Sequence, residues 1–310
     1  IVIIILVPLY NLSLTNTTKW RQYGITVLID NYTNDDTIDI DDNDNLYICK
    51  HAHNHVEVWS NNFTEKRIVA GGNRNGSEIN QLSMPTDIII NRKNNSIIIC
   101  DRGNRRIVEW SLRNATNGNI LISNIDCYKL AIDDQDYLYV SHQFQHEVRH
   151  WNVKTHENIL VAGGNGPGDD STRLHQPSFI FVGKDYSVYV ADHLSCRVMK
   201  WIKNAKEGIL VAGGHGTGSH LIQVSYPAAI IVDYLNNLYV SDLHNHRIMR
   251  RINGASDNSI VVGGNGDGNQ SNQLGYPIDF VFDKYGNMYI LNSHSYYTYT
   301  RIQKFYIASN

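Results

Sequence analysis

The feature that most constrains this chain is a pattern that recurs six times with a period of about 50 residues. The clearest copy reads Pro227-Ala-Ala-Ile-Ile-Val-Asp233, Asn237-Leu-Tyr-Val-Ser-Asp242, Asn245-His-Arg-Ile248 and Ile260-Val-Val-Gly-Gly264. The second motif has counterparts at Leu46-Tyr-Ile48, Ile97-Ile-Ile99, Leu138-Tyr-Val140, Val188-Tyr-Val190 and Met288-Tyr-Ile290. A fixed period of this length predicts a repeat architecture in which each unit stacks on its neighbours.

Each copy contains four short apolar runs separated by turn residues. In the fifth copy these runs are Ala229–Val232, Leu238–Ser241, Arg247–Arg251 and Ser259–Val262. Runs rich in β-branched and aromatic residues and bounded by Asn, Asp and Gly predict strands. One four-stranded sheet cannot bury both of its faces, whereas six sheets stacked around an axis can. We therefore predict an all-β fold, a six-bladed β-propeller of four-stranded blades.

The sixth copy ends near Phe305 and lacks a fourth strand. A segment at about residues 25–29 resembles the missing strand, and Trp20 precedes it, so we expect this segment to join the last blade and close the ring. The first four copies carry a Trp at the end of the third strand, which we expect to pack between blades: Trp59, Trp110, Trp151 and Trp201. Arg251 and Phe305 replace it in the last two copies. The propeller is predicted to span residues 20–310, after a separate segment of residues 1–19.

The motifs Pro-x-x-Ile-x-Val-Asp, Leu-Tyr-Val-x-Asp, Asn-His-Arg-Ile and Val-Ala-Gly-Gly resemble the NHL-repeat family over residues 20–307. Copies four to six match best, and Asp35 replaces the Pro of the first copy. The resemblance implies a six-bladed propeller used mainly for binding. Members of the family include RNA-binding tripartite-motif proteins, extracellular sensor domains and the peptidyl-glycine amidating lyases.

The resemblance also implies where a lyase site would lie. In the amidating lyases, zinc-binding histidines follow the repeat Pro at the mouth of the channel. The residues of this chain at that position are Asp36, Thr86, Tyr128, Ser178, Ala228 and Ile278, and none is His. We therefore predict no catalytic residues, no metal and no cofactor. A lyase or hydrolase with a metal held by loop histidines at the channel mouth is the alternative.

The next position of the repeat varies between copies. It carries Thr37, Asp87, Lys129, Phe179, Ala229 and Asp279. Variation inside a regular scaffold is where a binding site can differentiate. The predicted ligand-binding residues are Asp87, Lys129, Phe179 and Asp279, with the loop histidines His53, His193 and His244. Charge changes at such exposed positions are expected to alter association more than stability. A hydrated channel without function is the other interpretation.

Two further recurring features predict structural roles. Asp101, Asp192 and Asp242 follow the second strand, where a carboxylate can accept hydrogen bonds from amides of the following loop. Glycine-rich segments such as Gly213-Gly-His-Gly-Thr-Gly218 mimic phosphate-binding loops, but a strand follows them where a phosphate loop needs a helix. We interpret them as crossovers between blades.

The charge balance bears on partners. The formal net charge is −3, which gives no general basic footprint for nucleic acid. Arg102, Arg105 and Arg106 form only a local patch, so RNA binding is a third hypothesis. We predict a monomeric, non-enzymatic scaffold that binds a protein, peptide or glycan through its loop-rich face.

The N-terminal end indicates the secretory pathway. Ile1–Tyr10 is almost wholly apolar and too short to span a bilayer. Such a run is typical of a signal-peptide core or of the end of a signal anchor. An extra buried strand is the alternative. Sequons at Asn62, Asn94 and Asn114 are candidates for N-glycosylation. We expect a secreted or single-pass membrane-anchored protein that meets the membrane only through this segment. Cys100 and Cys127 could pair in such a protein, but their spacing does not assign the bond.

Overall fold

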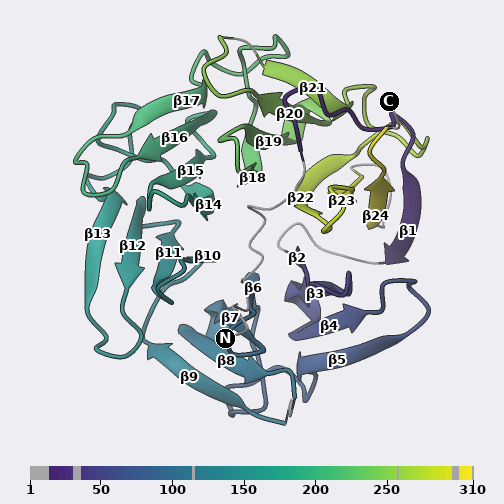
Figure 1. Ribbon diagram of the computed structural model, residues 1–310. Coiled ribbons are helices and arrows are strands. Elements are labelled where there is room, and N and C mark those ends of the chain that lie inside the picture. Colours follow the sequence, from purple (N-terminus) through teal and green to yellow (C-terminus); the bar gives the residue numbers. More distant parts are fainter. Residues whose placement is uncertain (1–13, 31–35, 114–115, 257, 295–299, 309–310) are drawn as a thin grey trace, which may run out of the picture.

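The computed structural model describes residues 14–308 except 31–35, 114–115, 257 and 295–299. These residues form six four-stranded antiparallel sheets arranged around a central axis (Figure 1). In five sheets the strands follow one another in chain order from the axis outward, and in the sixth β22 lies nearest to the axis and β1 outermost. The predicted six-bladed propeller is confirmed.

The blades follow one another along the chain. Blade one consists of β2 (Thr37–Ile40), β3 (Leu46–Lys50), β4 (His55–Trp59) and β5 (Lys66–Gly71). Blade two consists of β6 (Asp87–Asn91), β7 (Ser96–Asp101), β8 (Arg106–Ser111) and β9 (Gly118–Ser123). Blade three consists of β10 (Lys129–Ile132), β11 (Leu138–His142), β12 (Glu147–Trp151) and β13 (Asn158–Gly163). Blade four consists of β14 (Pro177–Val182), β15 (Val188–Asp192), β16 (Arg197–Trp201) and β17 (Ile209–Gly213). Blade five consists of β18 (Pro227–Val232), β19 (Leu238–Asp242), β20 (Arg247–Arg251) and β21 (Asn258–Gly263). Blade six consists of β22 (Tyr276–Phe282), β23 (Met288–Ser293), β24 (Thr300–Phe305) and β1 (Ile25–Asp30).

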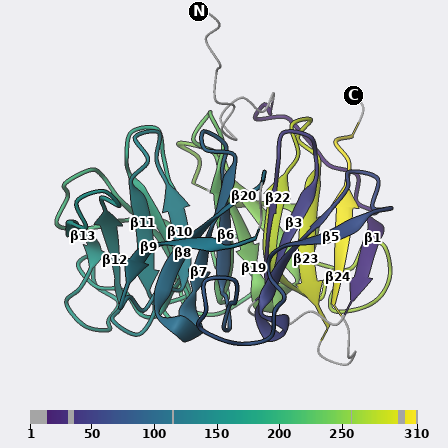
Figure 2. The same cartoon turned by 90° about the horizontal axis from the view of Figure 1, so that it is seen from below.

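The loops divide between the two ends of the channel (Figure 2). We call one end the loop face, because it carries the crossovers between blades and the loops between second and third strands. Short 3₁₀ helices form part of these loops in three blades: η2 (His51–His53), η3 (Arg102–Asn104) and η4 (Leu243–Asn245). The other end, the turn face, carries the tight turns between first and second strands.

The ring closes as predicted. β1 pairs antiparallel with β24, from Ile25 opposite Lys304 to Asp30 opposite Thr300. The last blade is thus built from both ends of the chain, and the outer edge of β24 is covered.

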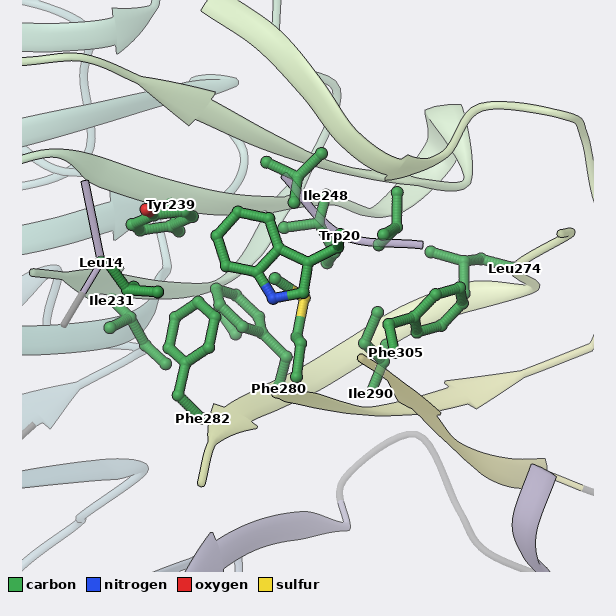
Figure 3. Close-up of a cluster of buried hydrophobic side chains, with 14 residues drawn as sticks. Leu14, Trp20, Ile231, Tyr239, Ile248, Leu274, Phe280, Phe282, Ile290 and Phe305 are labelled. Atoms are coloured by element: carbon green, nitrogen blue, oxygen red, sulfur yellow. The ribbon is translucent and has the colours of Figure 1, made fainter. Parts of the chain in front are cut away.

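Trp20 anchors the segment that leads into β1. Its Nε1 donates a hydrogen bond to the Gly286 carbonyl at 2.9 Å, and its ring centroid lies 5.9 Å from those of Tyr239 and Phe282 (Figure 3). Leu14 is also fully buried in this cluster. The residues packed on the propeller therefore begin before residue 20, inside the segment that the sequence separated from the domain.

The predicted packing tryptophans differ in burial. Trp110 and Trp201 are buried between blades, in clusters with Tyr47 and Tyr139 of the preceding blades. The other two, Trp59 and Trp151, are only partly buried.

The recurring Asp after the second strand accepts a backbone amide from the preceding crossover and not, as predicted, from the following loop; the following loop donates side-chain amides instead, from Asn104 to Asp101 and from Asn245 to Asp242. One carboxylate oxygen accepts the amide of a residue in the preceding crossover, and in blade four Asp192 accepts from His175 N at 2.6 Å. The other oxygen accepts Nε of the repeat Arg, here Arg197 at 2.8 Å. The same pairs occur at Asp101–Arg106 and Asp242–Arg247. Because the crossover precedes the blade in sequence but lies beside it in space, its backbone is the nearest set of unpaired groups.

The repeat Arg completes this arrangement, which we call the crossover brace. The Arg197 guanidinium donates to the carbonyls of Gly168, Asp169, Asp170 and Arg173 in the crossover before β14. The brace therefore holds a long loop without regular structure in one conformation.

Blade three lacks the brace and has a short crossover. His142 and Glu147 replace the Asp and Arg, and only residues 124–128 separate β9 from β10. A disulfide between Cys100 at β7 and Cys127 fixes this segment, so the pairing left open by the sequence is present. A bond with a sequence separation of 27 residues contributes about 3.5 kcal/mol in the chain-entropy account. Cys49 and Cys196 are buried free thiols.

The sequence features associated with export are placed only in part. Asn62 and Asn94 are exposed, whereas Asn114 and Ile1–Tyr10 lie outside the described residues. No helix within the described ranges has the length and apolar composition to cross a membrane.

Candidate binding site at the channel mouth

A cavity of about 380 Å³ opens at the loop face end of the channel. We call it the mouth pocket; its lining residues are Tyr128, Lys129, Ser178, His193, Ala228, Leu243, His244, Tyr276 and Ile278. The short crossover before β10 contributes Tyr128, and the inner strands contribute the floor. The loops after β15 and β19 contribute His193 and His244. The pocket is therefore built by blades three to six.

The structure brings together three of the predicted binding residues. Lys129, His193 and His244 line the mouth pocket. Asp87, Phe179 and Asp279 line a second cavity, of about 220 Å³, inside the channel. His53 lies apart from both, exposed in η2, with its ring 6.0 Å from that of His55.

A ladder of aromatic rings borders the mouth pocket along blades four to six. The rings follow in the order His193, Tyr226, His244, Tyr276 and His246, with centroid separations of 5.3, 4.4, 5.7 and 5.0 Å. The two tyrosines were missed by the search for variable positions. The available signal was the Tyr-Pro pair that opens copies five and six.

The two pocket histidines are neutral at pH 7. Burial lowers the pKa of both His193 and His244 below the ordinary value. Nδ1 of His193 lies 3.1 Å from the Pro227 carbonyl. Because a carbonyl can only accept, we assign the proton to Nδ1, which leaves Nε2 as an acceptor.

Lys129 supplies a fixed positive charge at the floor of the mouth pocket. Its Nζ donates to the Thr86 carbonyl at 3.1 Å and lies 3.5 Å from Asp87 Oδ1. Phe179 presents its ring centroid 5.6 Å from Nζ. Burial alone would lower the pKa of Lys129, but Asp87 and Asp279 reverse this, so its pKa lies above the ordinary value.

The channel carboxylates join neighbouring blades. Asp279 accepts the amide of Ile38 at 3.0 Å and Asp87 accepts that of Leu130 at 2.7 Å, each in the inner strand of the next blade. Asp39, which the sequence did not single out, accepts Ile90 N at 2.9 Å in the same way. These carboxylates occupy amides that face the channel without a strand partner. They are buried. The sequence-based assumption that Asp87, Lys129 and Asp279 are exposed is therefore wrong, and substituting them is expected to change stability as well as association.

Asp279 is expected to make stability depend on pH. Burial raises its pKa from 3.8 to about 7, against the opposing effect of Lys129. The folded chain therefore keeps a proton that the unfolded chain loses, and the free energy of unfolding falls as pH rises between about 4 and 7, then levels off. Between about pH 5 and pH 8 this fall is on the order of 2 kcal/mol. Asp279→Asn removes the titrating group, so urea unfolding at the two pH values should show a smaller fall in the variant; an equal fall in both proteins would contradict this assignment.

Fold and site together define a propeller with a side-chain-lined pocket at one end of its channel. The chain matches the DUF5128 family, described as a 6-bladed beta-propeller, over residues 36–207, and it belongs to this family. No curated protein matches the chain. Within the described part of the chain, no three His, Cys, Asp or Glu side chains are grouped so that they could hold a metal ion.

Solved structures share the fold at low sequence identity. A structural genomics protein of unknown function from Bacteroides thetaiotaomicron superposes with a TM-score of 0.69 at 15% identity, covering 94% of this chain and 70% of its own. An auxiliary nutrient binding protein from the same organism gives 0.67 at 14%, covering 88% and 68%. Virginiamycin B lyase from Staphylococcus aureus gives 0.56 at 10%, covering 94% and 100%. At these identities the likeness extends to the fold alone.

Proposed function

We propose that this protein is a non-enzymatic carbohydrate-binding propeller whose mouth pocket receives the end of a glycan. The observation that carries the proposal is the lining of that pocket. Tyr276 and His244 offer aromatic faces on which the C–H face of a sugar ring can stack, and His193 Nε2 and Lys129 offer an acceptor and a donor for hydroxyls. A volume of 380 Å³ falls within the range typical of small-ligand sites, about 300–1,000 Å³.

A glycan suits this pocket better than a peptide. Extended peptides commonly bind by adding a strand to a free sheet edge. At the channel, side-chain carboxylates occupy amides of the inner strands at Ile38, Ile90 and Leu130. The mouth therefore recognises a ligand through side chains, as a sugar site does. The auxiliary nutrient-binding role named for one structural neighbour supports the same class of function.

The proposal includes an extracellular location and an NHL-type repeat. The Cys100–Cys127 disulfide supports an oxidising compartment. Trp20 packs at the turn face beside Gly286, and Asn16 accepts a hydrogen bond from Asn237 there. An attachment before residue 14 would thus leave the mouth pocket directed away from the membrane.

Separate substitutions Tyr276→Ala and His244→Ala are expected to weaken glycan binding by about tenfold or more, since each removes a stacking face. His53→Ala is the matched control, because this histidine is exposed outside the pocket. The measurement is binding of the full chain to an array of oligosaccharides, followed by calorimetry with the glycans retained. Absence of glycan binding by the wild type, or equal binding by all variants, would overturn the proposal and return the ligand to the peptide or protein class.

A further inference from the structure

Arg102 differs from the arginines of the crossover braces. The guanidinium of Arg197 is committed to Asp192 and to crossover carbonyls. Within the described part of the chain, the Arg102 guanidinium donates no hydrogen bond, and it forms one long ion pair, with 3.8 Å between its Nε and Asp126 Oδ1. Its side chain is 23% exposed. The ion pair lies on the Nε side, so the N–H donors of the two Nη atoms are available to a ligand.

Arg102 belongs to a small surface that continues the mouth pocket. Its guanidinium carbon lies 5.1 Å from the ring centroid of Tyr128, which lines that pocket, and 5.3 Å from that of Phe144. Phe144 is 59% exposed. We call Arg102, Asp126, Tyr128 and Phe144 the notch.

The loop beside the notch is short. The crossover into blade three comprises only residues 124–128, whereas the one into blade four comprises residues 164–176. The disulfide at Cys127 holds the short crossover immediately before Tyr128. A chain-like ligand whose end occupies the mouth pocket can therefore leave the propeller over the notch.

We propose that the notch is a second subsite, which binds a carboxylate-bearing sugar unit of an acidic polysaccharide. The guanidinium of Arg102 fits a carboxylate through two parallel hydrogen bonds, and the exposed ring of Phe144 supports the sugar. Lys129 at the floor of the mouth pocket adds a second positive charge along the same path. This inference rests on the proposed function and deepens it, since it names the class of glycan.

The test compares two ligands of equal length, an oligogalacturonate and its fully methyl-esterified form, by calorimetry on the full chain. The wild type is expected to bind the acid about tenfold more tightly than the ester. Arg102→Gln should remove most of this preference, because it lowers affinity for the acid far more than affinity for the ester. Phe144→Ala should weaken the binding of both ligands. The control is Arg105→Gln, because Arg105 is exposed on the same loop and should leave the preference intact.

The two proposals fail in different ways. If Tyr276→Ala abolishes binding but Arg102→Gln retains the preference for the acid, the notch assignment is overturned and the mouth pocket stands. If the wild type binds acid and ester equally, or binds neither, the acidic-chain inference is overturned, and the oligosaccharide array decides the proposed function on its own. The preference should also shrink between about 0.05 M and about 0.5 M NaCl, because salt screens exposed charge pairs.

Discussion

Removal of residues 14–30 is expected to prevent folding, or to lower the melting temperature by more than about 10 °C. The deletion removes β1 and leaves the outer edge of β24 unpaired, so the last blade loses one of its four strands. It also removes the buried side chains of Leu14 and Trp20. Trp20→Ala alone should cost about 3–5 kcal/mol, since it empties a large site in the core between the last two blades and leaves the Gly286 carbonyl without its donor.

A matched control lies in the same segment. Tyr23 is 67% exposed, so Tyr23→Ala should change the free energy of unfolding by less than about 0.5 kcal/mol. Thermal unfolding followed by circular dichroism compares the truncated chain, Trp20→Ala and Tyr23→Ala with the wild type. If the truncated chain melts with the full-length protein, the N-terminal strand is not needed to seal the ring.

Ring closure was predictable because the number of strands in each repeat can be counted from the sequence. Counting four strands per copy shows that the sixth copy lacks one, and a run at about residues 25–29, before the first copy, resembles the missing fourth strand. The packing partners of Trp20 were not predictable in this way. Tyr239 and Gly286 are distant in sequence, and they meet Trp20 only because the two ends of the chain share a blade.

The candidate site was also predictable only in part, because the repeat pattern gives positions within a blade but not contacts between blades. Repeat alignment identifies positions that share one ring of the propeller, and it placed Asp87, Lys129 and Asp279 around the channel. It does not show what each carboxylate contacts, because the acceptor sites face the next blade, as Asp279 faces Ile38. The alignment also could not show which cavity each side chain lines, since Lys129 lines the mouth pocket while Asp87 lines the second cavity.

The aromatic ladder depends on contacts that join three successive blades. The ring of Tyr226 lies between those of His193 of the blade before and His244 of its own blade. In the sequence these residues look like unrelated members of separate repeats. Likewise, His53 has the same residue type and the same kind of loop as His244, but it belongs to a blade whose loop does not border the mouth pocket.

Arg197→Met is expected to lower the free energy of unfolding by about 3–5 kcal/mol, the cost of leaving a buried charge without its partner. Asp192 is fully buried, and the substitution also removes the donors of crossover carbonyls such as that of Asp170. The control is Arg173→Met, whose ion pair with Asp170 is half-exposed and should contribute less than about 1 kcal/mol. Urea unfolding measures both.

The pH dependence of the Arg197→Met variant separates a brace from ordinary packing. Burial already raises the pKa of Asp192 above the ordinary value of 3.8, and loss of the arginine raises it further. The folded variant then holds a proton that the unfolded chain releases, so the destabilisation should be smaller at about pH 5 than at about pH 8. Asp192→Asn combined with Arg197→Met should recover part of the loss at the higher pH, because the amide carries no charge to desolvate. Equal losses for Arg173→Met and Arg197→Met, or a loss independent of pH, would show that the crossovers are held by packing and not by the buried ion pair.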